Sequence, residues 1–202
     1  MVSSKATSPH VLTAMEVDYE SVEAVRRVHR VQWKENEGFS LTYLPFIVHA
    51  VARSLAAFPR INASVKDTYL VIYNEIKVGV AVDLYFKGLV VPVIRGVDVL
   101  PLTEIARQIV NVAERAHARR LAPDDMAGGT FTITNAGPFG TMLQFPIINQ
   151  PQVAILSTDG VSRKPAVVTD SDGTNPSRFV PSEYLPWPGT TEPLTGPTQH
   201  HS

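Results

Sequence analysis

The sequence has 202 residues, a formal net charge of −1, no cysteine, 44% hydrophobic residues and 18% charged residues. A chain of this length can bury one substantial core. Its near-neutral charge argues against bulk attraction to nucleic acid or anionic membranes, and the absence of cysteine excludes disulfides, thiolate metal sites and a cysteine nucleophile. No apolar run reaches the length of a membrane span. We therefore expect a cytoplasmic protein with no nucleic-acid or membrane partner.

The first part of the chain alternates between strand and helix patterns. Residues 10–17 favour a strand, and a helix over 19–35 follows. A second helix is predicted over 44–58, because Pro45 suits its first turn and Pro59 ends it. Its buried stripe is expected at Phe46, Ala50, Val51, Leu55 and Phe58.

The middle of the chain is rich in strand patterns. Strands are predicted over 69–73, 76–84 and 89–94, the last two joined as a hairpin by a turn that ends in Gly88. A third helix is predicted over 103–120. Its inward face is expected at Ile105, Ile109, Val112 and Ala116. Two further strands are expected at 129–135 and 152–156.

These elements predict an α/β or α+β fold with mixed strand directions. Residues 10–168 are expected to form one mixed sheet with the three helices packed on it. The segment 170–202 differs, because it carries six prolines between Pro176 and Pro197 among Ser, Thr and Gly. No helical or strand period survives there, so an irregular tail is predicted, in which residues 174–202 pack poorly.

The ionisable residues give no catalytic pattern by themselves. The histidines show no metal-ligand spacing, and no glycine-rich nucleotide-binding motif is present. His49 is predicted to be a hydrogen-bonded structural residue, whereas His29 and His117 lie on charged helix faces and are predicted to be solvated. His10, at a strand start, stays open between a structural and a functional role. Asp124-Asp125 is interpreted as a turn rather than a catalytic carboxylate pair.

Four segments occur in an informative order. They are SKATSPHVLTAMEVD (4–18), IKVGVAVDLYFKGLVVPVIRGVDVLPLTEIA (76–106), GGTFTITNAGPFG (128–140) and PQVAILSTDGVSRKPAVV (151–168). In this order and spacing they resemble the catalytic core domain of the 2-oxo-acid dehydrogenase acyltransferases, the dihydrolipoamide acyltransferases. The resemblance covers residues 4 to about 169.

The resemblance implies a chloramphenicol-acetyltransferase-like α/β sandwich that assembles into trimers and larger cores with the other dehydrogenase complex subunits. It implies an active site between two subunits, entered by coenzyme A from one side and lipoyl-lysine from the other, the lipoyl domain being absent from this chain. A histidine in an H-R-x-x-D-G motif takes the thiol proton. A Ser or Thr in the F-T-I-[ST]-N segment, here Thr134, binds the oxyanion. The alternative for Thr134 is an ordinary strand threonine.

The chain departs from the family in one respect that matters for catalysis. No H-R-x-x-D-G, nor any His-x-x-x-Asp, occurs in the 202 residues. The family would add two or more strands after Val168, and Met1 falls inside its first core segment. We therefore expect residues 1–169 to be a partial catalytic domain, truncated at both ends with the C-terminal strands missing, and 170–202 to be the proline-rich tail.

The genetic code permits an explanation of this tail. If the frame is shifted back by one base, the codons of residues 188–196 can encode A-W-D-H-R-A-F-D-G, and those of 179–187 can encode the apolar strand I-R-P-I-G-V-L-A-M. We hypothesise that the frame was lost between about Gly173 and Arg178. A nucleotide sequence that cannot encode D-H-R in the shifted frame contradicts this hypothesis.

Two classes of function follow from these observations. The first is an acyltransferase that acts between dihydrolipoamide and coenzyme A but is inactive in this chain because its catalytic histidine motif is absent. The alternative is a non-catalytic remnant or assembly subunit of a trimeric acyltransferase core. Such a subunit could still offer Thr134 to a neighbour's histidine.

Overall fold

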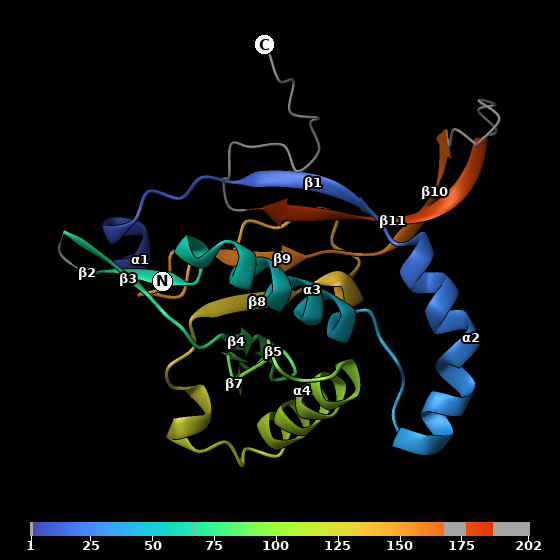
Figure 1. The fold of residues 1–202 in the computed structure, drawn as a ribbon, viewed down its shortest axis with the longest axis horizontal. Helices are drawn as coiled ribbons and strands as arrows, with labels where there is room; N and C mark the ends of the chain where they lie inside the picture. Colours follow the sequence, from blue (N-terminus) through green and yellow to red (C-terminus); the bar gives the residue numbers. More distant parts are fainter. Residues whose placement is uncertain (1, 67, 168–176, 188–202) are drawn as a thin grey trace, which may run out of the picture.

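The structure, a computed structural model, describes residues 2–66, 68–167 and 177–187 (Figure 1). Its helices are α1 (Val2–Thr7), α2 (Glu20–Glu37), α3 (Leu44–Ala57) and α4 (Leu102–His117). Its strands are β1 (Thr13–Asp18), β2 (Ala63–Lys66), β3 (Tyr69–Ile72), β4 (Lys77–Val80), β5 (Val82–Asp83), β6 (Leu89–Val90), β7 (Val93–Arg95), β8 (Phe131–Asn135), β9 (Ile155–Thr158), β10 (Ser162–Val167) and β11 (Ser177–Trp187). The predicted mixture of helices with strands of both directions is confirmed.

The core is built on a four-stranded sheet in the order β7-β4-β8-β9. β4 is antiparallel to β7 and parallel to β8, and β8 is parallel to β9. The register aligns Val78 with Ile94 and Phe131, and Ile133 with Leu156. Paired residues share a face of a sheet, so these apolar side chains form one buried layer.

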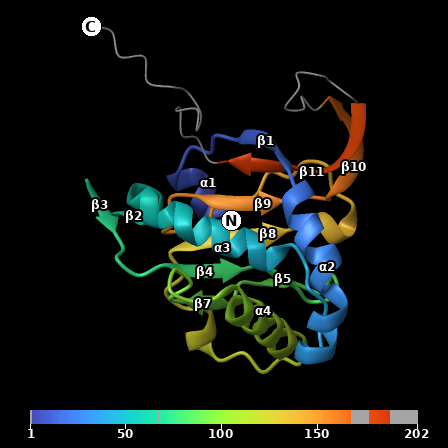
Figure 2. The same ribbon diagram turned by 45° about the vertical axis from the view of Figure 1, so that its right-hand side comes forward.

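The helices α3 and α4 pack on that apolar layer (Figure 2). From α4, the inward face Ile105, Ile109, Val112 and Ala116 is buried as predicted. From α3, the buried residues are Pro45, Ile47, Val48, Val51, Ala52 and Leu55. The predicted stripe of α3 was therefore only partly right, since Ala50 and Phe58 are exposed. α3 is apolar on most sides, and its sequence does not reveal which side meets the sheet.

The prediction of one sheet is wrong, because the described strands divide into four separate sheets. The predicted strand 76–84 breaks at Ala81, whose amide still bonds the Ile133 carbonyl at 2.9 Å. After this break, β5 pairs with β6 instead of extending the main sheet. The predicted hairpin at 85–88 is confirmed, and Tyr85 and Phe86 take positive φ values of 55° and 61° in its turn.

The prediction of an irregular tail is wrong for residues 177–187, which form strand β11. β11 lies between β1 and β10 and is antiparallel to both (Figure 1). Only Pro181 and Pro186 of the tail prolines lie inside it. Pro181 is paired with β10 alone and Pro186 with β1 alone, so each proline lies where β11 has a partner strand on one side, a position that tolerates the loss of an amide donor. The rest of the predicted tail lies outside the described residues.

α2 is attached to the molecule by polar contacts. It contains no buried residue, and Val28 on its surface is 74% exposed. Tyr43 donates a hydrogen bond of 2.7 Å to Glu23, which also pairs with Arg26. The hydrogen bond from Tyr43, helped by the charge of Arg26, holds the pKa of Glu23 below its ordinary value. Farther along the helix, Glu37 pairs with Arg107 of α4 at 2.7 Å.

The buried layer predicts the effect of truncating a core residue. Ile133 lies in the central strand β8 and is 0% exposed. Ile133→Ala should lower the free energy of unfolding by about 2–5 kcal/mol, because it removes apolar contacts and leaves a cavity. Denaturant unfolding measures this loss. Leu89→Ala, at a position 63% exposed, is the control and should change it by less than about 0.5 kcal/mol. Equal losses for the two variants would contradict the assigned core.

Candidate functional site

Thr134 lies near the carboxyl end of β8, half-buried. Phe131 and Ile133 of this strand point into the core beneath α3 and α4. Side chains alternate along a strand, so Thr132 and Thr134 point to the opposite face of the sheet. Among the described residues, the Thr134 hydroxyl has no hydrogen-bond partner. The hydroxyl is therefore not used in a hydrogen bond within the core, and it can donate to a bound ligand.

Residues 141–152 form a loop that is anchored on this second face. The register pairs Thr134 with Ser157 of β9, and Ser157 donates a hydrogen bond of 2.7 Å to Oε1 of Gln144. The hydroxyl of Thr132 donates to Oε1 of Gln152, also at 2.7 Å. The loop is therefore bonded to side chains that lie beside Thr134 both along β8 and across to β9.

A glycine of β4 completes this face. The register pairs Gly79 with Thr132. A Cβ atom on Gly79 would lie 2.7 Å from Cγ1 of Val91 and 3.3 Å from the Thr132 hydroxyl. The first of these separations is closer than side chains tolerate, so a larger residue at position 79 would displace Val91.

A cavity of about 450 Å³ opens beyond the carboxyl end of β8. Asn135, Thr158 and Asp159 line it from the sheet, and residues of α3 and α4 supply an apolar wall. The turn after β8 is tightly held, because the amide of Gly137 donates to the Asn135 side chain at 3.0 Å. Thr134 itself does not line this cavity.

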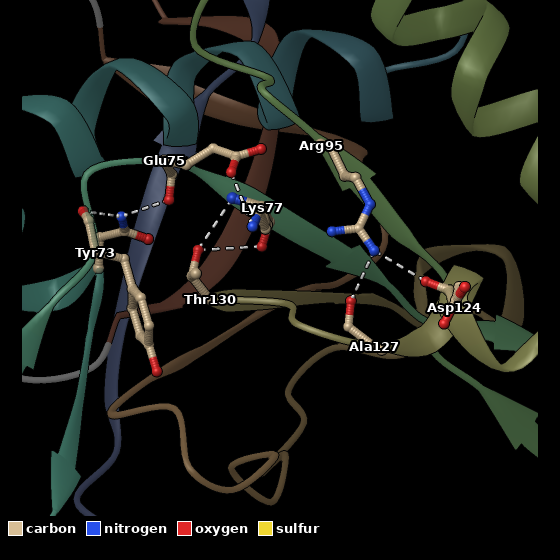
Figure 3. A network of polar contacts seen from close by, with 8 residues as sticks. Tyr73, Glu75, Lys77, Arg95, Asp124, Ala127 and Thr130 are labelled. Atoms are coloured by element: carbon tan, nitrogen blue, oxygen red, sulfur yellow. Dashed lines mark hydrogen bonds and ion pairs between the residues drawn. The ribbon is translucent and has the colours of Figure 1, made fainter.

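A second cavity of about 540 Å³ lies at the amino end of β8. Figure 3 shows the polar network beside it, in which the Lys77 amide donates to the Thr130 hydroxyl at 3.0 Å and the Lys77 ammonium pairs with Glu75 at 2.8 Å. Arg95 donates to the carbonyls of Asp124 and Ala127 (Figure 3). This network fixes the start of β8 beside β4 and so positions the strand that carries Thr134.

None of the four described histidines replaces the missing motif. His117 bonds the carbonyl of Asp83 and stacks on Tyr85, and His29 is exposed as predicted. His49 was predicted to be satisfied, but its buried Nδ1 has no partner among the described residues. His10 accepts a hydrogen bond from the amide of Ile148, so it makes a structural contact. No cluster of metal-binding side chains occurs in the described part of the chain.

Some residues of this site could not be found from the sequence. Thr134 was located by the resemblance of its segment. Gln144, Gln152 and Ser157 carried no signal, because a lone glutamine in a loop or a serine in a strand is common in any protein. Asp125 pairs with Arg115 and accepts from the Ala122 amide, consistent with the predicted turn.

The sequence and fold match those of known proteins over most of the chain. The family described as 2-oxoacid dehydrogenases acyltransferase (catalytic domain) matches residues 1–183. The acetyltransferase component of the Bacillus subtilis pyruvate dehydrogenase complex is 40% identical over 177 residues, which are 85% of this chain and 39% of that protein. The acetyltransferase component of the corresponding Corynebacterium glutamicum complex is 36% identical, over 92% of this chain and 27% of that protein.

A solved structure agrees in fold as well as in sequence. A probable dihydrolipoamide acetyltransferase from Listeria monocytogenes aligns with a TM-score of 0.84 and 32% identity, over 92% of this chain and 77% of that one. The chain spans less than half the length of the curated relatives named above. Among the described residues, none of the helices combines the length and the apolar character of a membrane-spanning segment. The extent of these matches shows that the chain belongs to the 2-oxoacid dehydrogenase acyltransferase family, through its catalytic domain.

Proposed function

We propose that the fold serves acyl transfer between dihydrolipoamide and coenzyme A, with Thr134 as the hydroxyl that donates to the oxyanion. One thiolate attacks the thioester carbonyl and forms a new C–S bond. The tetrahedral oxyanion then collapses, and the other sulfur leaves as a thiolate that takes up a proton. The observation that carries the proposal is the hydroxyl of Thr134, unbonded among the described residues and bordered by the anchored loop 141–152.

The proposal includes substrates and partners supported by the relatives. These relatives are the acetyltransferase and succinyltransferase components of dehydrogenase complexes. Coenzyme A would be a substrate, and a lipoyl domain would supply the lipoyl-lysine. A solved relative with a TM-score of 0.82 is the cubic core of a pyruvate dehydrogenase complex, which supports a core assembly with the other subunits of such a complex. The proposal takes this core to be a homotrimer or larger, and to lie in the cytoplasm.

The proposal also holds that the 202-residue chain does not catalyse acyl transfer by itself. The family's H-R-x-x-D-G motif does not occur in them. In another solved relative, the dihydrolipoamide acetyltransferase of Azotobacter vinelandii, a serine, a histidine and an asparagine have been investigated for their role in the catalytic mechanism. That description supports a chemistry that depends on a histidine as well as on a hydroxyl.

Restoring the reading frame tests the assignment of the reaction. The restored chain, in which residues 188–196 read A-W-D-H-R-A-F-D-G and the family's first core segment is supplied upstream, should transfer acetyl from acetyl-coenzyme A to dihydrolipoamide. Thioester formation on the dihydrolipoamide measures this transfer. A restored protein that folds but transfers no acyl group would reject the proposed function.

A further inference from the structure

The N-terminal arm, residues 2–10, is clasped to the loop 141–152 by four hydrogen bonds. The Ile148 amide donates to Nε2 of His10 at 3.0 Å, and the Ser4 hydroxyl donates to the Ile148 carbonyl at 2.7 Å. The Gln150 side chain donates to the hydroxyls of Ser4 at 3.3 Å and Ser8 at 3.0 Å. Both backbone polar groups of Ile148 are thus bonded to the arm.

The clasp requires the imidazole of His10 to be neutral. An amide N–H can only donate, so Nε2 of His10 must be the unprotonated nitrogen that accepts it. The other nitrogen, Nδ1, lies 2.8 Å from the Ser8 carbonyl and must carry the proton that it donates there. These two contacts fix one tautomer. A doubly protonated ring has no acceptor left for the Ile148 amide.

The clasped loop is the one that is bonded to the face that carries Thr134. Between Thr141 and Gln152 it provides Gln144, which accepts from Ser157, and Gln152, which accepts from Thr132. Ile148 lies between these two anchors along the loop. A change at Ile148 therefore acts on the segment that borders Thr134, although the hydrogen bonds of His10 among the described residues go to Ser8 and Ile148.

We propose that His10 is a positioning residue, whose neutral ring holds the loop 141–152 in place over the Thr134 face and whose protonation releases it. Histidine side chains change charge between about pH 5 and 8. The loop contributes no ionisable side chain, and the described arm contributes Lys5 besides His10, with Glu16 the next one in β1. No carboxylate of the arm or loop is therefore available to stabilise the charged ring within the clasp.

Hydrogen exchange at the Ile148 amide tests the clasp in the full chain. After correction for the intrinsic exchange rate, its protection should fall by about tenfold between pH 8 and pH 5, which corresponds to the loss of a hydrogen bond worth roughly 1.4 kcal/mol. In His10→Gln, Oε1 can accept the same bond without titrating, so protection should persist at pH 5. In His10→Ala, protection should be low at both pH values.

The matched control is His29→Gln on the exposed surface of α2, which should keep the wild-type pH dependence. Protection of Ile148 that does not change with pH in the wild type, or an equal fall in His10→Gln, would overturn the proposal. If His10 had only a structural role, His10→Gln would not protect the Ile148 amide better than the wild type does at pH 5.

The expected effect of the clasp on acyl transfer rests on the proposed function. In the frame-restored protein, His10→Gln should retain more transfer at pH 5.5 than the parent does, each relative to its own rate at pH 8. No transfer by the parent would reject the proposed function while the exchange result still decides the clasp. Transfer with the same pH profile in both would refute the positioning role.

Discussion

The 202-residue chain is expected to transfer no acyl group between coenzyme A and dihydrolipoamide above the rate measured without protein. The thiol of coenzyme A is mostly protonated at neutral pH, as an unperturbed thiol is, so attack requires removal of its proton. A positioned general base is typically worth roughly 10²–10⁴-fold. His10 and His117 are hydrogen-bonded elsewhere and His29 is exposed. His49 lies in α3, on the face of the sheet opposite to Thr134.

Transfer should be assayed with the pure chain, the frame-restored protein and a frame-restored variant in which the histidine of the D-H-R segment is replaced by alanine. The chain and the alanine variant should behave alike. Mixing the chain with an intact relative examines the alternative of an assembly subunit, for which transfer should exceed that of the relative alone. Robust turnover by the 202-residue chain by itself would defeat the claim that its base is absent.

Thr134→Ala in the frame-restored protein should lower turnover by roughly 10²–10³-fold, as expected for the loss of one donor to an oxyanion. The reason is geometric, since the hydroxyl has no other bond among the described residues and lies on the face that the core does not fill. Steady-state kinetics with both thiol substrates measures this loss, which should fall on kcat more than on KM.

Two matched variants separate this role from a structural one. Thr134→Ser keeps a hydroxyl and should retain most of the activity, whereas Thr134→Val keeps the shape without the hydroxyl and should lose as much as alanine. Ile133→Ala is a core change in the same strand. It should lower the free energy of unfolding, while the turnover of each folded molecule should fall far less than in Thr134→Ala. If valine were as active as threonine, Thr134 would be an ordinary strand residue and the assignment would be wrong.

The sequence predicted elements best where polar and apolar residues contrast strongly. On α4, the charged residues leave one clear apolar face, and its four predicted inward positions are buried. On α3, the apolar residues surround most of the helix, so Phe58 was predicted to be buried but is 47% exposed. The prolines after residue 168 predicted irregular structure, yet β11 contains Pro181 and Pro186, each at a position that is paired with one neighbouring strand only.

The site could be predicted only as far as its local segment. Thr134 follows from the residues beside it in sequence. The clasp joins His10 to Ile148 across 138 positions, and Ser157 meets Gln144 through a loop whose path depends on tertiary packing. No periodicity or motif encodes such pairings. The predicted boundary between residues 169 and 170 and the trimer both remain predictions.

The attachment of α2 has a consequence for how stability is distributed over the molecule. Opening free energies within one native protein range from near zero to the global value, according to how much each unit buries. α2 buries no residue fully, and among its side chains only Val22 packs against the core. It ends at Gly38, which takes a left-handed φ of 79°. We therefore expect the helix to open at a lower free energy than the sheet that carries Thr134.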